Sequence, residues 1–296
     1  MKIDRDILRK VSALKLATPR VADGPLQGDR RSPRRGRGVE FADYRAYSPG
    51  DDLRLVDWNI YGRLELLLVR LFHEDLNMTV QIFLDASASM GFGSPRKADH
   101  GAQLAACLAL IALLNQDSVT VKCLGGDGPR ILARGQNSSA FAEVVHLLEH
   151  VEPAGHGEPW REINAARASK PADRAFLISD MLQEPEQMEK TLRALKASSH
   201  APVLLHVLGE EELEPDLSKA QHMIDSETGE ELVIQGGKKA KRDYEEALRT
   251  WLELLEGRCR RMGIHYLSVM TDQSVSDLLA RMMRQAGVTQ SASGVA

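Results

Sequence analysis

Residues 79–90, TVQIFLDASASM, decide the fold of this chain. The first half is an almost continuous apolar run, which is typical of a strand buried on both faces of a parallel sheet. The second half turns abruptly polar and places Asp85, Ser87 and Ser89 at alternate positions. Because ligands of open α/β sheets bind at the carboxyl ends of the strands, the stretch predicts a binding loop directly after a buried strand.

This polar loop carries the first residues of a candidate metal site. The Asp85 carboxylate and the hydroxyls of Ser87 and Ser89 are hard oxygen donors, which Mg²⁺ prefers. The same residue types also cap helices, and the apolar pattern of residues 97–115 predicts a helix just downstream. A metal site is the favoured interpretation because the loop joins an apolar strand to a long apolar helix, and helix capping stays an alternative.

Apolar runs alternate with helical patterns along the rest of the chain. Further strands are expected at 118–124, 172–179, 202–208 and 264–269, and further helices at 139–150, 186–196, 243–262 and 274–285. This alternation predicts an α/β fold, with a mostly parallel sheet and helices on both faces. The polar interval 73–77 predicts an antiparallel turn that joins a strand at 66–72 to the strand at 79–84.

Two motifs resemble known families. Residues 85–90, Asp-x-Ser-x-Ser-Met, resemble the metal-ion-dependent adhesion site of von Willebrand factor A domains. Residues 36–58 contain Gly-Arg-Gly-Val-Glu-Phe, Tyr-Arg-x-Tyr-x-Pro-Gly-Asp-Asp and Arg-x-x-Asp-Trp, which closely resemble the signature of a bacterial family catalogued as domain of unknown function 58. That family joins such a segment to a von Willebrand factor A-like domain. The resemblance runs from about Gly36 to the end of the chain and implies a Rossmann-type fold for that domain.

The resemblance also implies further site residues. The family places an acidic metal-site residue after the strand at 172–179, and Asp180 matches it, although Asp180 is equally suited to capping a helix. Von Willebrand factor A domains usually supply a threonine in the loop that corresponds to residues 152–160, where this chain has Gly155-His156-Gly157-Glu158. Glu158 offers an oxygen ligand, whereas His156 favours a softer metal. The expected ligands of Mg²⁺, or of another divalent cation such as Mn²⁺, are Asp85, Ser87, Ser89, Asp180 and Glu158.

The chain is expected to contain four parts. Residues 1–35 form a helix, at 3–16, and a basic linker, and residues 36–72 form the signature segment, packed on the main domain. Residues 73–286 form the von Willebrand factor A-like domain, and residues 287–296 form a disordered tail. The arginines, aspartates and aromatic residues of the signature predict an ion-pair network, with a partner-binding face as the alternative.

Composition excludes several classes of protein. A net charge of −4 on 296 residues does not favour a general nucleic-acid binder. Three scattered cysteines argue against a disulfide framework and fit a reducing cytosol, and no apolar stretch is long enough to predict a membrane span. The sequence also lacks the glycine-rich phosphate loop of P-loop nucleotide hydrolases. These features predict a cytoplasmic protein.

The leading functional hypothesis is a non-enzymatic, metal-dependent protein-interaction module. The resemblance adds that such proteins are often encoded beside MoxR-type AAA+ ATPases and are thought to act as their adaptors. A carboxylate of the ATPase or of its client is expected to dock over Ser87, Ser89 and Asp180, because Mg²⁺ leaves coordination positions open. Two alternatives remain: a scaffold with a degenerate metal site, and a metal-assisted hydrolase that uses Asp85 and Asp180 but lacks an evident general base.

Overall fold

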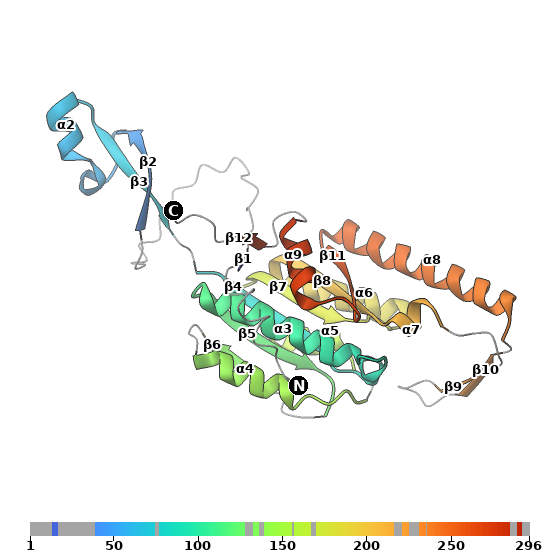
Figure 1. Ribbon diagram of the computed structural model, residues 1–296. Helices are drawn as coiled ribbons and strands as arrows, with labels where there is room; N and C mark the ends of the chain where they lie inside the picture. The colour runs from blue at the N-terminus through green and yellow to red at the C-terminus, as the bar shows by residue number, and fades with distance from the viewer. Residues whose placement is uncertain are drawn as a thin grey trace. The chain divides into compact units, whose positions relative to one another are not determined.

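A six-stranded sheet in the order β11–β8–β7–β4–β5–β6 lies at the centre of the larger unit of the chain (Figure 1). The computed structural model describes residues 14–16, 39–74, 77–127, 133–135, 139–155, 157–166, 170–215, 221–224, 231–234, 236–284 and 289–291. Five strands are mutually parallel: β4 (Thr79–Asp85), β5 (Ser118–Leu124), β7 (Ala172–Ser179), β8 (Ser199–Leu208) and β11 (His265–Met270). The short strand β6 (Ala133–Gly135) pairs antiparallel with β5.

Helices cover both faces of this sheet, which confirms the predicted α/β class. The alternation along β4 sends Ile82 and Leu84 to one face and Phe83 to the other, and each face has its own apolar core. The first core includes residues of α3 (Lys97–Leu114), α4 (Ser139–Glu149) and α9 (Val275–Arg284). The second includes residues of α5 (Pro159–Ala166), α6 (Pro185–Ser198) and α8 (Lys238–Met262).

Helix α3 is long and strongly apolar. Among the described helices, it is the only one long and apolar enough to cross a membrane, and 78% of its apolar window is buried inside the protein. Leu104, Leu108 and Ile111 are fully buried against the sheet. Packing on the sheet therefore accounts for its apolar composition.

The direction of the connections between strands reverses between β4 and β7. After β4 the chain proceeds through α3 to β5 on one side, whereas after β7 it proceeds through α6 to β8 on the other side. Open α/β sheets bind ligands where the direction of the connections reverses in this way, at the carboxyl ends of the two strands. Asp85 ends β4 and Asp180 follows β7, so both predicted acidic residues lie where the connections reverse.

Residues Asp23–Asn77 form a second unit, and its described residues include two strands. Strand β2 (Val39–Ala46) pairs antiparallel with β3 (Leu68–Glu74), and between them lie the 3-10 helix η1 (Leu53–Leu55) and helix α2 (Trp58–Leu64). The predicted antiparallel turn between β3 and β4 is therefore wrong. Both edges of β4 are already paired, with β5 and β7, so β4 has no free edge for β3.

The signature segment contains the predicted ion-pair network. Both terminal guanidinium nitrogens of Arg45 donate to Asp51, each at 2.9 Å. The Tyr44 hydroxyl donates to Asp57 at 3.0 Å, and Asp57 also accepts from the backbone of α2. Trp58, by contrast, is 55% exposed and does not seal this network. The expected packing of this segment on the main domain stays a prediction.

Near both ends of the chain, the described residues form strands that the sequence does not predict. Leu14–Leu16 form strand β1, where the sequence predicts part of a helix, and Thr289–Ser291 form strand β12, where it predicts disorder. β1 and β12 pair antiparallel with each other, so each depends on a partner at the other end of the chain. The remainder of the predicted helix, the basic linker and residues 292–296 lie outside the described residues.

Asp117, which precedes β5, provides a test of stability against pH. Its side chain is 4% exposed, one carboxylate oxygen accepts from the Met78 backbone N–H at 2.8 Å, and the other has no hydrogen-bond partner among the described residues. Burial raises the pKa of Asp117 from 3.8 to about 6 in spite of the Met78 hydrogen bond, with a smaller contribution from the charge of Asp173. The stability gained from protonated Asp117 is therefore fully present below the unfolded-state pKa. It is lost as the pH rises through about 6, where Asp117 ionises in the folded protein.

Asp117→Asn is expected to raise the free energy of unfolding at pH 8 by about 1–3 kcal/mol, because the neutral amide avoids burying a charge. The gain should shrink as the pH falls and vanish below pH 4. Urea denaturation at pH 4, 6 and 8 measures this difference, with Asp243→Asn as a control at an exposed aspartate. An equal effect of Asp117→Asn at all three pH values would contradict this prediction.

Candidate functional site

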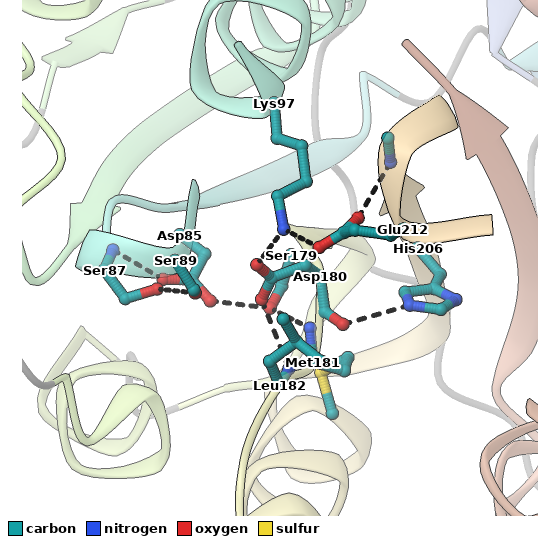
Figure 2. Close-up of polar contacts among 11 residues, drawn as sticks. Asp85, Ser87, Ser89, Lys97, Ser179, Asp180, Met181, Leu182, His206 and Glu212 are labelled. Atoms are coloured by element: carbon teal, nitrogen blue, oxygen red, sulfur yellow. Dashed lines mark hydrogen bonds and ion pairs between the residues drawn. The ribbon is translucent and has the colours of Figure 1, made fainter. Parts of the chain in front are cut away.

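The loop after β4 is held by the Asp85 carboxylate. One carboxylate oxygen accepts from the Ser87 backbone N–H at 2.9 Å, and the other accepts from the Ser179 hydroxyl, at the end of β7, at 2.6 Å. The hydroxyl oxygens of Ser87 and Ser89 lie 3.1 Å apart (Figure 2). Asp85, Ser87 and Ser89 are all buried, so the carboxyl ends of β4 and β7 are joined through a polar interior.

A second carboxylate lies close to Asp85. Burial, followed by the negative charge of Asp180, raises the pKa of Asp85 from 3.8 to about 6, while hydrogen bonds from Ser179 and Ser87 oppose the rise. The structure thus brings Asp85, Ser87, Ser89 and Asp180 together at one edge of the sheet. Their role as metal ligands stays a prediction.

Asp180 is fixed from both its side chain and its backbone. One carboxylate oxygen accepts from the Leu182 backbone N–H at 3.2 Å, and the backbone carbonyl lies 3.0 Å from Nε2 of His206 on β8. Burial lowers the pKa of His206 to about 4, so its imidazole is neutral at pH 7. A neutral ring that donates to the Asp180 carbonyl through Nε2 accepts at Nδ1 from the Tyr266 hydroxyl, 2.8 Å away.

A fully buried lysine completes this cluster. Lys97, the first residue of α3, donates through its ammonium group to Asp180 at 2.7 Å and also to Glu212, on the short helix α7 (Glu210–Leu213). Figure 2 shows the ammonium between these two carboxylates, with Ser87 and Ser89 on the Asp85 side of the cluster. Burial lowers the pKa of Lys97, but the charges of Asp180 and Glu212 outweigh it and raise the pKa, so the lysine is charged.

Glu158 does not join this cluster through any described hydrogen bond. Its carboxylate pairs with Arg161 at 2.8 Å, and its side chain is 35% exposed. Its loop does approach the site through the backbone, because Ala154 donates to the Ala86 carbonyl at 3.0 Å and Ala88 donates to the Gly155 carbonyl at 3.1 Å. His156, the other candidate of this loop, lies outside the described residues.

Four residues of the cluster are not predicted as site residues from the sequence: Lys97, Ser179, His206 and Glu212. A signal exists for Ser179, because it directly precedes Asp180 at the end of a predicted strand. Lys97 and Glu212 carry no such signal. A lone lysine at the start of a helix and a glutamate within an acidic loop are both typical of solvated surface.

The oxygen atoms of the site suit a divalent cation of the Mg²⁺ type. Two neighbouring ligands of an octahedral Mg²⁺, each about 2.1 Å from the ion, lie about 3 Å apart. The hydroxyl oxygens of Ser87 and Ser89, at 3.1 Å, match this spacing. No group of three or more His, Cys, Asp or Glu side chains in the described part of the chain is arranged to hold a metal, so a cation here would depend on these two hydroxyls.

Two solved structures show a loose likeness to this chain. One is the conserved hypothetical protein BatB from Bacteroides thetaiotaomicron, with a TM-score of 0.41 and 14% identity over 70% of this chain and 98% of that one. The other is an aerotolerance-related membrane protein from Bacteroides fragilis, with a TM-score of 0.38 and 16% identity over the same shares of the two chains.

Sequence comparisons reach nearly the whole chain. Two uncharacterised proteins, Mb1516 of Mycobacterium bovis and Rv1480 of Mycobacterium tuberculosis, are each 27% identical to it over 290 residues, which cover 95% of this chain and 89% of the relative. The model of one family, described as protein of unknown function DUF58, matches residues 43–285, which include the Asp23–Asn77 unit in part and the whole acidic cluster. The chain therefore belongs to the DUF58 family.

Proposed function

We propose that this chain is a non-enzymatic protein-interaction module that binds its partner in a metal-dependent manner at the carboxyl ends of β4 and β7. The charge of the buried cluster carries this proposal. The cluster contains three carboxylates, on Asp85, Asp180 and Glu212, and one ammonium group, on Lys97, which pairs with Asp180 and Glu212. With all three carboxylates ionised, the cluster has a net charge of −2, which a divalent cation would neutralise.

Ser87 and Ser89 would hold this cation through their hydroxyl oxygens, and Asp85 and Asp180 would contribute directly or through water. The bound cation would supply positive charge and an open coordination position, as in the adhesion site of the von Willebrand factor A domains that this loop resembles. Without it, the negative cluster would repel an acidic partner. An acidic side chain of a protein partner is therefore the expected ligand of the loaded site.

The geometry favours binding over hydrolysis. A hydrolytic site requires a general base within hydrogen-bond reach of the group that it activates. The imidazole of this cluster, on His206, is instead bonded to the Asp180 carbonyl and the Tyr266 hydroxyl. The Ser179 hydroxyl donates to Asp85 and accepts from the Met181 backbone N–H. Both groups hold the ends of strands in place.

We propose a MoxR-type AAA+ ATPase, or a client of such an ATPase, as the partner, with this chain as a cytoplasmic adaptor. The support is the resemblance of residues 36–58 and 85–90 to families with that association. The three cysteines, Cys107, Cys123 and Cys259, are buried and free, which is compatible with a reducing compartment.

Mg²⁺ is expected to raise the melting temperature of the wild-type protein. A ligand that binds only the folded state stabilises it by about 2.7 kcal/mol at a hundredfold excess over its dissociation constant. Ser87→Ala removes one proposed ligand and should reduce the shift, whereas Thr250→Ala, which removes an exposed hydroxyl from α8, should not. Thermal melts in EDTA and in millimolar Mg²⁺ provide the measurement. No shift in the wild type would favour the scaffold alternative.

Partner binding is expected to depend on the same residues. An AAA+ ATPase captured from the native host in Mg²⁺ should be lost in EDTA and with Ser87→Ala or Asp180→Ala, and retained with Thr250→Ala. Quantitative mass spectrometry of the captured proteins, with circular dichroism of each variant to verify folding, tests this prediction. If EDTA and both site substitutions leave the capture unchanged, the interface lies elsewhere on the chain.

A further inference from the structure

The buried ammonium of Lys97 occupies an unusual position for a lysine. It reaches from the first residue of α3 to Asp180 at the end of β7 and to Glu212 on α7, and its side chain is fully buried. Lysine is almost never fully buried unless it is paired, because an uncompensated charge is costly inside a protein. Here the pairing is with a residue of the proposed metal site itself.

We propose that Lys97 is the resident cation of this site, which pairs with Asp180 and Glu212 in the metal-free protein, offsets part of their negative charge and thereby sets a weak affinity for a divalent cation. The inference deepens the proposed function, and it rests on the metal site of that proposal. Lys97 acts through Asp180 and Glu212 and is a positioning residue, since nothing requires its ammonium to touch the metal or the partner.

The physical reason is competition for negative charge. An ammonium and a divalent cation that both neighbour Asp180 repel each other, and the repulsion is strong because burial reduces screening. With Asp85, Asp180 and Glu212 ionised and Lys97 charged, the cluster has a net charge of −2. Lys97→Met would make it −3 and attract a cation more strongly. Glu212→Gln would make it −1 and attract a cation less strongly.

These two substitutions separate charge from structure. Both remove the same ion pair between Lys97 and Glu212. A purely structural role, in which the pair holds α7 near α3, predicts that both substitutions disturb the site and change cation affinity in the same direction. The resident-cation role predicts opposite directions.

Isothermal titration of the full chain with Mn²⁺ at pH 8 tests the inference. We expect the affinity to rise about tenfold or more in Lys97→Met and to fall about tenfold in Glu212→Gln, relative to wild type. Glu211→Gln is the matched control on the same helix, because Glu211 accepts from the Ser94 backbone N–H and has no described contact with Lys97. Its affinity should equal that of the wild type.

The outcomes distinguish this inference from the proposed function. Binding by Lys97→Met but not by the wild type would support the resident cation and overturn metal dependence of the natural protein. Binding by the wild type with changes of the same sign in both variants, or with no change, would overturn the resident cation and leave the proposed function standing. Absence of binding in all four proteins would overturn both. If Lys97→Met does not fold, the comparison of Glu212→Gln with Glu211→Gln decides, and equal affinities in those two would overturn the inference.

Discussion

In EDTA, Lys97→Met is expected to lower the free energy of unfolding by about 3–5 kcal/mol, because removal of one partner from a buried ionic group leaves uncompensated charge. The substitution preserves most of the side-chain volume, so lost packing contributes little. It leaves Asp180 and Glu212 without the ammonium that lies between them. Urea denaturation at pH 8, monitored by circular dichroism, gives the value.

The control is a protein in which Lys97 and both carboxylates that pair with it are replaced by neutral residues. Lys97→Met combined with Asp180→Asn and Glu212→Gln should recover most of the lost stability, since replacement of a complete buried ionic group is often close to neutral. A triple variant as unstable as Lys97→Met alone would show that packing, and not charge, causes the loss. A loss below about 1 kcal/mol in the single variant would contradict the prediction directly, because that is the size expected of an exposed pair.

Gly126→Ala is expected to destabilise the protein by about 3 kcal/mol in total, from backbone strain and overpacking. Gly126 has a φ of +77°, and an added Cβ would lie 2.8 Å from the Ala86 Cβ and 2.9 Å from the Glu152 carbonyl oxygen. Ala86 lies between Asp85 and Ser87, so relief of this clash displaces the loop of the proposed metal site. The variant should therefore lose Mn²⁺ affinity as well as stability.

Gly155→Ala is the matched control for this effect. Gly155 also has a positive φ, of +70°, but an added Cβ there meets no atom within 4 Å. Only the backbone cost of about 1–2 kcal/mol should remain. Thermal melts and Mn²⁺ titrations of both variants measure the difference. Equal losses would mean that the close approach of Gly126 to Ala86 has no part in holding the loop.

The sequence predicts the sheet well because its strands are buried on both faces. Apolar runs such as β4 and β7 are distinct from the helical patterns between them, and the structure confirms the resulting α/β fold. The pairing of strands is harder to predict from the sequence. The turn predicted between β3 and β4 has a suitable local sequence, but β3 pairs with β2. Local sequence cannot show which edges of β4 are already taken by distant strands.

The site is predictable only in part, for a similar reason. Asp85, Ser87, Ser89 and Asp180 follow apolar strands, and parallel topology brings their loops to one edge. Lys97 reaches the same edge from a helix, and its partners lie 83 and 115 residues away in the sequence. Glu158 pairs with its neighbour Arg161 and has no described hydrogen bond to the cluster, so its role as a ligand stays a prediction.

The separation between Lys97 and Glu212 also has a consequence for biosynthesis. At about 5–20 residues per second, a ribosome takes about 6–23 s to add the 115 residues that separate them. During that interval the nascent chain holds a lysine destined for the interior without its second counterion. The acidic edge is therefore completed only after most of the chain has been translated, and a truncated product that ends before α7 cannot assemble it.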